Sequence, residues 1–221
     1  IHEYQAKELL ERYGVRTQSG HLAQTPSQAG EAYTRLGGEL AVIKAQVHAG
    51  GRGKGGGVKL VKSRNEAESV SDSMLGMNLV THQTGPDGVE VQKVFVAEGL
   101  DLEAEYYVAI AMDRASGNPV LMVSPEGGVD IEALADENPE AILRLGFSAS
   151  RGLPDHQARR AAFFLGLSGD AAKQVGVILH GLASAWVELD CELAEINPLV
   201  LTSQGELVAL DAKMSFDGNA L

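Results

Sequence analysis

Glycines and basic side chains gather in one stretch of the sequence, residues 50–57 and the segments on either side of it. Six of these eight residues are glycine. No acidic residue occurs between Glu39 and Glu66, whereas six of the 18 Lys and Arg residues fall there, in a chain of formal net charge −12. Because glycine loses the most backbone entropy on ordering, this density predicts backbone that must approach something bulky. The local positive charge indicates a phosphate-bearing ligand.

The spacing of the glycines separates three known kinds of phosphate loop. A Walker-type loop needs Ser or Thr after its lysine, but Gly55 follows Lys54. Residues 51–56 match the dinucleotide fingerprint G-x-G-x-x-G, but that fingerprint opens a helix, and Val58–Val61 has the pattern of a strand. Protein kinases have a strand–loop–strand flap with this spacing, but no H-R-D or D-F-G motif follows here.

The remaining interpretation is a glycine flap over a nucleotide. We expect residues 40–46 to form the strand before the flap, with Lys44 on that strand reaching the phosphates. A solvated loop between two strands is the alternative that the pattern leaves open.

A second group of polar side chains lies near the end of the chain. The turn signal at residues 203–206 separates two apolar segments, which predicts a β-hairpin. Pairing about this turn sets Asn197 opposite Asp211 and Glu195 opposite Lys213, and side chains two apart in a strand share a face. We therefore expect these four side chains to cluster at the end of the hairpin away from the turn.

The oxygen atoms in this cluster are of the kind that Mg²⁺ prefers. An amide oxygen and a carboxylate, with a second carboxylate nearby, suit an ion that keeps several waters and is completed by substrate phosphates. Residues of the same parity nearer the turn are apolar (Leu199, Leu201, Leu207 and Ala209), so the polar cluster is local. With the glycine flap, it predicts phosphoryl transfer. The alternative is a structural salt bridge of Glu195 with Lys213.

These side chains need an alternation of helices, short strands and hairpins to position them, which indicates an α/β or α+β domain. Helices are predicted by apolar spacing and capping signals, and strands by apolar runs between turn signals. The predicted helices are residues 2–13, 26–36, 65–75, 138–145, 157–166 and 169–189. The predicted strands, besides the flap and the hairpin, are residues 20–23, 91–96, 106–112 and 120–123. An acidic connector is expected at residues 97–105.

The composition limits the classes of function. The 221 residues, 44% of them hydrophobic, suffice for one large domain or two small ones. No apolar run approaches the ~20 residues that cross a bilayer, and the net acidity argues against nucleic-acid or membrane binding. Cys191 is the only cysteine, which indicates a reducing compartment without a disulfide framework.

Several segments resemble one known family, the β subunits of succinyl-CoA synthetase. The similarity runs from residue 2 to the end, and it implies an ATP-grasp fold of class α+β, with a nucleotide between two subdomains of one domain, residues 1–221. Residues of about 20–100 would carry the flap, and residues of about 101–221 the magnesium hairpin. The segments that carry the resemblance are HEYQAKELL, KAQVHAGGRGKGGGVKL, LGMNLVTHQT, PEGGVDIE and AEINPLV, followed by LDAK and DGNAL.

The resemblance also implies an activity, that of an acid–thiol ligase of the citric acid cycle. Such enzymes interconvert succinate, CoA and a nucleoside triphosphate with succinyl-CoA, the diphosphate and phosphate. The implied cofactors are Mg²⁺ and ATP/ADP or GTP/GDP. The implied partner is the α subunit, which carries a phosphohistidine and the CoA site, and the implied location is the bacterial cytoplasm or the mitochondrial matrix.

Members of the family continue with a flavodoxin-like domain, so this chain resembles their nucleotide-binding half. We expect it to bind the magnesium nucleotide but to need the α subunit and the further domain for thioester formation. A malate–CoA ligase β subunit and a non-catalytic interaction module with the same fold are the alternatives.

Carried over position by position, the resemblance implies roles for individual residues. Glu105 is implied at the ribose, and Gln18 lies where the base is expected, where an amide suits guanine. Many relatives have Glu at the base-binding hinge, where this chain has Ala97 followed by Glu98. Glu195 is implied to hold the phosphohistidine. The other implied positions are Lys44, Gly51, Arg52 and Gly53 at the phosphates, Ala97 and Leu100 at the base, and Asn197 and Asp211 at Mg²⁺.

Overall fold

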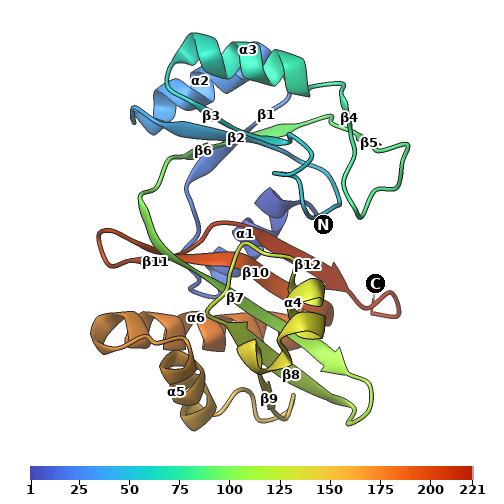
Figure 1. The fold of residues 1–221 in the computed structure, drawn as a ribbon, viewed down its shortest axis with the longest axis vertical. Coiled ribbons are helices and arrows are strands. Elements are labelled where there is room, and N and C mark those ends of the chain that lie inside the picture. The colour runs from blue at the N-terminus through green and yellow to red at the C-terminus, as the bar shows by residue number, and fades with distance from the viewer. Residues whose placement is uncertain (221) are drawn as a thin grey trace. The chain divides into compact units, whose positions relative to one another are not determined.

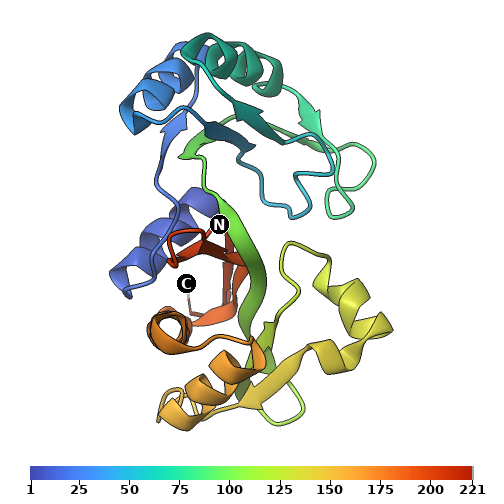
Figure 2. The ribbon, with the colours of Figure 1, turned by 60° about the vertical axis from the view of Figure 1, so that its left-hand side comes forward.

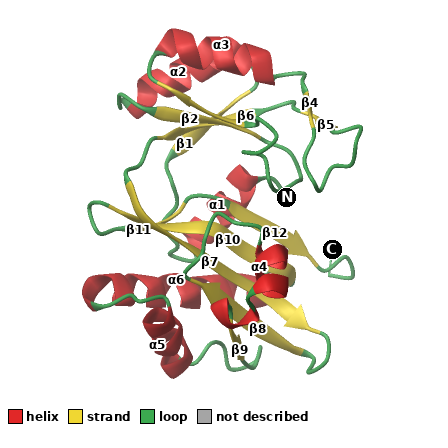
Figure 3. Cartoon of the chain, viewed as in Figure 1, coloured by secondary structure: helices red, strands yellow, loops and turns green. Residues whose placement is uncertain are grey.

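The computed structural model describes residues 1–220; Leu221, which ends the DGNAL segment, lies outside the described residues. The chain divides into two compact units. The small unit contains residues 18–100 together with His2, and the large unit contains residue 1, residues 3–17 and residues 101 onward. The N-terminal helix therefore belongs to the large unit, although the strand that follows it in sequence belongs to the small one (Figures 1 and 3).

The small unit is a four-stranded antiparallel sheet of order β1-β6-β2-β3 with helices α2 and α3 on one face (Figure 1). Its core contains Ile43 and Val96 from the central strands and Met74 from a helix. The elements are β1 (Gly20–Ala23), α2 (Pro26–Leu36), β2 (Ala41–Ala45), β3 (Val58–Val61), α3 (Arg64–Met74), β4 (Asn78–Leu79), β5 (Val89–Glu90) and β6 (Val94–Glu98).

Capping side chains set where the helices of the small unit begin. The Thr25 hydroxyl accepts a hydrogen bond from the backbone N–H of Gln28, and Pro26 occupies the first turn of α2. Ser63 accepts from the N–H of Glu66 at 3.2 Å, and the Glu66 carboxylate accepts from the N–H of Lys62 at 2.7 Å, which forms a capping box for α3.

The large unit contains a six-stranded sheet in which β11, β10, β7, β8 and β9 are successive neighbours and β12 also pairs with β10. Figure 2 shows α1 and α6 on one side of β7 and α4 on the other. The elements are α1 (Glu3–Arg12), β7 (Leu102–Asp113), β8 (Asn118–Ser124), α4 (Ile131–Glu137), the 3-10 helix η1 (Pro139–Ala141), β9 (Leu143–Gly146), α5 (Asp155–Phe164), α6 (Gly169–Glu188), β10 (Cys191–Thr202), β11 (Leu207–Ala209) and β12 (Ala212–Phe216).

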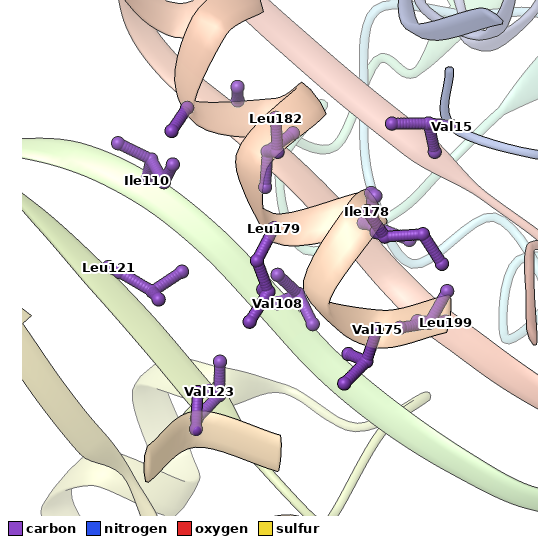
Figure 4. Packing of buried hydrophobic residues seen from close by; sticks show 14 of the residues in the cluster. Val15, Val108, Ile110, Leu121, Val123, Val175, Ile178, Leu179, Leu182 and Leu199 are labelled. Atoms are coloured by element: carbon purple, nitrogen blue, oxygen red, sulfur yellow. The ribbon is translucent and has the colours of Figure 1, made fainter. Parts of the chain in front are cut away.

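Helix α6 supplies much of the core of the large unit. Its Leu179 and Leu182 are fully buried and lie against the face of β7 that carries Val108 and Ile110 (Figure 4). Because strand side chains alternate, the neighbouring residues of β7, Tyr107 among them, point to the opposite face. One face of the sheet is therefore core, and the other is available for polar side chains. Among the described residues, no helix is long and apolar enough to span a bilayer.

Most of the predicted elements are confirmed, but three predictions are wrong. Residues 138–145 form η1 and the start of β9 instead of a helix, because Pro139 begins only a short 3-10 turn. The strand predicted at 91–96 is β6 (Val94–Glu98), which begins three residues later and ends two residues later. The acidic connector predicted at 97–105 is mostly strand, and only residues 99–101 link β6 to β7.

Candidate functional site

The glycine loop of the small unit connects β2 and β3 as predicted, with Lys44 paired opposite Val58. The loop turns back on itself, since Gly57 N–H donates to the Arg52 carbonyl at 2.8 Å and Gly56 N–H donates to the Gly53 carbonyl at 3.1 Å. The backbone of this loop is therefore ordered by its own hydrogen bonds.

The glycines of the loop are of two kinds: some pack closely against neighbouring residues, and at Gly53 the space beside the backbone is open. A Cβ at Gly51 would lie 2.8 Å from the His82 ring, and one at Gly55 would lie 2.6 Å from the Val80 carbonyl oxygen. These glycines pack against residues 79–83, so for them the close approach that the glycine density predicts is to the chain itself. At Gly53, in contrast, a Cβ would meet nothing within 4 Å, and its φ is not in the left-handed region. Gly53 is also exposed, so a ligand has access to its backbone.

The two predicted phosphate-binding cations of the small unit are buried, Lys44 with 5% of its surface exposed and Arg52 with 6%. A buried ammonium or guanidinium needs polar partners. Lys44 Nζ donates to Gln18 Oε1 at 2.8 Å, and Arg52 Nη1 donates to the Ala45 carbonyl at 2.7 Å. These two bonds fix the positions of the ammonium and guanidinium groups beside the glycine loop.

The structure places Gln18 in the interior of the small unit. It is buried, and its amide joins two parts of the small unit: Oε1 accepts from Lys44, and Nε2 donates to the Glu98 carbonyl. In this arrangement Gln18 orients the Lys44 ammonium. In the sequence, only the position of Gln18 just before β1 pointed to a role at the site.

Of the two predicted base-binding residues, Ala97 lies near the end of β6 and Leu100 lies just after it. Ala97 is fully buried in the middle of the sheet, paired with Gly20 on one side and Val42 on the other. Leu100 is half-buried and is the last residue of the small unit. Glu98, between them, accepts a hydrogen bond from Ser19 N–H at 3.0 Å through its carboxylate.

The hairpin of the large unit has the predicted register. Glu195 pairs with Lys213, and the N–H of Asn197 donates to the Asp211 carbonyl at 3.1 Å. Nearer the turn, Leu199 pairs with Ala209. The polar residues are thus at one end of the hairpin and the apolar residues at the other.

The expectation that the polar and apolar residues share one face is wrong. The core of the large unit contains Ala194 and Ile196 but then Leu199, so the residues of β10 that face the core change from even to odd. The pairing of β10 with β7 shifts register between Ile196 and Leu199, and this irregularity reverses the alternation of side chains. Glu195 therefore points away from the core, whereas Leu199 points into it.

Glu195 has an unusual electrostatic environment. Burial raises its pKa to about 7; the nearby Lys213 ammonium opposes this rise, and the carboxylates of Glu132 and Asp211 reinforce it. The Tyr107 hydroxyl lies near the Glu195 carboxyl group, and burial raises the pKa of that phenol far above its usual value. A carboxyl group that titrates near neutrality can hold or release a proton at physiological pH. Sequence reasoning missed Tyr107 and Glu132, because they come from β7 and α4 through pairings that the sequence does not encode locally.

The predicted magnesium ligands differ in their surroundings. Asp211 is half-buried and immediately precedes β12. The Asn197 amide contacts the loop between β8 and α4: Oδ1 accepts from Gly128 N–H at 2.8 Å, and Nδ2 donates to the Val129 carbonyl at 3.1 Å. Glu105, on β7, lies against the same loop, where its carbonyl accepts from Gly127 N–H at 3.1 Å.

The oxygen donors of the hairpin fit a Mg²⁺ ion that has only a few protein ligands. The described residues contain no group of three or more His, Cys, Asp or Glu side chains that could hold a metal ion, so a cage made only of such side chains is excluded for them. Asn197 Oδ1 keeps a second lone pair beside its bond to Gly128, and Asp211 supplies a carboxylate. Two hard oxygen donors suit an ion whose remaining positions are filled by water and phosphate oxygens.

Comparison with known proteins identifies the class. A family model described as "ATP-grasp domain" matches residues 1–201, so the chain belongs to the ATP-grasp family.

Curated relatives narrow the similarity to one group of enzymes. The chain is 50% identical over 221 residues to the succinate–CoA ligase [ADP-forming] subunit beta of Bdellovibrio bacteriovorus, and 54% identical to the subunit of that name from Anaeromyxobacter sp. (strain K). Both comparisons cover 100% of this chain and 57% of the relative. The chain thus spans little more than half the length of these relatives.

Solved structures support the fold. A dinucleotide-forming acetyl-coenzyme A synthetase 1 from Ca. Korarchaeum cryptofilum superposes with a TM-score of 0.75 at 18% identity, covering 98% of this chain and 93% of that one. ATP citrate lyase from Methanothrix soehngenii gives a TM-score of 0.67 at 20% identity, covering 99% of this chain and 51% of that one. At these identities the likeness concerns the fold alone.

Proposed function

We propose that this chain is the nucleotide-binding part of the β subunit of a succinate–CoA ligase. The observation that carries the proposal is the polar end of the hairpin, where Asn197 is paired with Asp211 beside the half-buried Glu195. The shared name of the relatives supports succinate over malate as the acid, and its "ADP-forming" part supports ATP and ADP over GTP and GDP.

In this proposal the small unit binds the phosphates and the large unit binds the metal. Lys44 and Arg52 supply positive charge, and the open backbone at Gly53 allows phosphate oxygens to approach N–H groups. Asn197 Oδ1 and Asp211 would hold Mg²⁺, which when bound neutralises charge on the phosphates during phosphoryl transfer.

The remaining proposed roles concern the ribose, the base and the partner subunit. Glu105 contacts the ribose, and Ala97 and Leu100 contact the base. Glu195 accepts a hydrogen bond from a phosphohistidine of the α subunit, while Tyr107 Oη–H holds the Glu195 carboxylate in place. The α subunit supplies that phosphohistidine and the CoA site, so thioester formation requires it.

Calorimetry on the folded chain tests this proposal. ADP in MgCl₂ should bind with measurable heat, and GDP should bind more weakly. Asp211→Ala should weaken ADP binding about 100-fold in MgCl₂ but about threefold or less in EDTA, because loss of a direct ligand costs at least as much as loss of an outer-shell partner. Asp136→Ala removes an exposed carboxylate of α4 and should change neither affinity.

Two results would contradict the proposal in different ways. An equal loss in MgCl₂ and EDTA on Asp211→Ala substitution would remove Asp211 from the metal site. Absence of heat with Mg·ADP and Mg·GDP, for a chain whose circular dichroism shows it folded, would instead favour a non-catalytic interaction module.

A further inference from the structure

The loop between β8 and α4 holds the amide of Asn197 in one orientation. Gly128 offers an N–H donor and Val129 offers a carbonyl acceptor, at 2.8 and 3.1 Å from the Asn197 side chain. Because one partner is a donor and the other an acceptor, only one of the two amide orientations satisfies both. The loop therefore determines which end of the amide carries the oxygen.

Two consecutive glycines allow the loop to lie this close to β7. A Cβ at Gly127 would be 2.4 Å from the Tyr106 nitrogen, and one at Gly128 would be 2.3 Å from Glu105 Oε2. Gly128 also has φ +70°, which disfavours a side chain. Gly128 thus lies against Glu105 and binds Asn197, and Gly127 binds Glu105 through its N–H.

We propose that residues 127–129 are a positioning loop for the magnesium site, which orients Asn197 so that the second lone pair of Oδ1 is directed to the cation. This inference rests on the proposed function, since it requires Asn197 to be a metal ligand. A carbonyl oxygen accepts two partners, so the bond from Gly128 and a bond to the cation are compatible. Partners that orient a metal ligand typically change metal affinity 10–100-fold.

The contact with Glu105 extends this role to the nucleotide. The Gly127 N–H binds the carbonyl of Glu105, and Gly128 packs on its carboxylate, so the loop that orients the metal ligand also supports the residue proposed at the ribose. A side chain added at Gly128 should disturb both, and a test must separate the two effects.

The ratio of ADP affinities in MgCl₂ and in EDTA makes this separation, because effects on the ribose contact alone cancel in it. Gly128→Ala should lower this ratio about tenfold. The matched control is Gly117→Ala, at an exposed turn of the same unit: its φ is +66°, but a Cβ there meets nothing within 4 Å. It carries the same backbone strain and should leave the ratio unchanged. A ratio unaffected by Gly128→Ala would overturn the proposal.

A double-mutant cycle shows whether the loop acts through Asn197. If it does, Gly128→Ala should have no further effect on the ratio in an Asn197→Ala background; additive losses would contradict it. The outcomes also separate the two proposals. An unchanged ratio in Asn197→Ala would refute the metal-ligand role itself, whereas a lowered ratio there with none in Gly128→Ala would refute the positioning loop alone.

Hydrogen exchange of the wild-type Gly128 amide, followed by NMR, keeps the proposal testable even if Gly128→Ala does not fold. The amide should exchange about tenfold more slowly in the wild type than in Asn197→Ala, in keeping with one lost hydrogen bond. Its protection should persist in Mg·ADP. Release of the amide by Mg·ADP would mean that the loop and the metal compete for Oδ1, and it would overturn the proposal.

Discussion

The glycine loop of the small unit and the hairpin of the large unit are two different kinds of binding surface. The loop offers backbone N–H groups and two buried cations whose described partners are a side-chain amide and a carbonyl. The hairpin offers side-chain oxygens brought together by cross-strand register, with Glu195 among other carboxylates. We therefore expect the loop to bind the nucleotide phosphates with or without Mg²⁺, whereas the hairpin should contribute to nucleotide binding only through the metal.

Among the substitutions that test this difference, replacing Lys44 should change ADP affinity the most. Lys44→Met keeps the length of the apolar stem but removes the charge, and ADP affinity should fall about 10–100-fold, the range for a lost charge-assisted hydrogen bond. The fall should be similar in MgCl₂ and in EDTA, unlike that of Asp211→Ala. Isothermal titration in both buffers measures it.

A neighbouring lysine supplies the control. Lys59 lies on β3 of the same β2–β3 hairpin but is exposed, so Lys59→Met should change the affinity little. If Lys44→Met weakened binding in MgCl₂ alone, the distinction between an anion-binding loop and a metal-binding hairpin would fail.

The raised pKa of Glu195 gives a test of the hairpin, because it makes folding stability depend on pH. Because its native pKa is about 7 and the ordinary pKa of a glutamate is 4.5, the native state holds the proton more tightly than the unfolded state. The stability from this group is present below pH 4.5 and is lost as the pH rises through 7. Glu195→Gln cannot lose that stability, so it should gain about 3 kcal/mol relative to the wild type as the pH rises from 4.5 to 7.

Urea unfolding in EDTA without nucleotide, at several pH values, measures this difference. Glu192→Gln, at an exposed position of the same strand, should show no pH-dependent gain. A difference between Glu195→Gln and the wild type that stays flat from pH 4 to 8 would rule out the proposed environment of Glu195.

The smallest predicted effect separates the glycines within the loop. Gly51→Ala should destabilise the small unit by about 1 kcal/mol or more, because Gly51 has φ +71° and a Cβ would meet His82 at 2.8 Å. Gly53→Val should cost less stability, since its Cβ site is open, but it should weaken ADP binding if phosphate approaches this backbone. Thermal unfolding and ADP titration of both variants give the answer, and equal behaviour would erase the division into packing and ligand glycines.

The parts of the molecule that the sequence predicted well are those specified by nearby residues. Thr25 and Pro26 fix the start of α2, and the turn at residues 203–206 sets the pairing of Asn197 with Asp211. The glycine loop was recognisable for the same reason, although its packing against residues 79–83 was not, because that contact joins segments distant in sequence.

The parts that the sequence did not predict depend on non-local pairing. Tyr107 reaches Glu195 only because β7 pairs with β10, and the reversal of faces in β10 appears only in the register of that pair. Residues 138–145 show the opposite failure: their local pattern favours a helix, but β9 gains pairing with β8 at the sheet edge instead.

The irregularity of β10 between Ile196 and Leu199 divides this strand into two stretches that can vary separately. With strict alternation, a substitution that improved the packing of Leu199 would alter the surface that carries Glu195. Because the alternation is reversed, mutations in the stretch near the turn should change folding stability, and those in the stretch that carries Glu195 should change ligand affinity. Deleting one residue within the irregularity would merge the two stretches and turn either the carboxylate inward or the leucine outward.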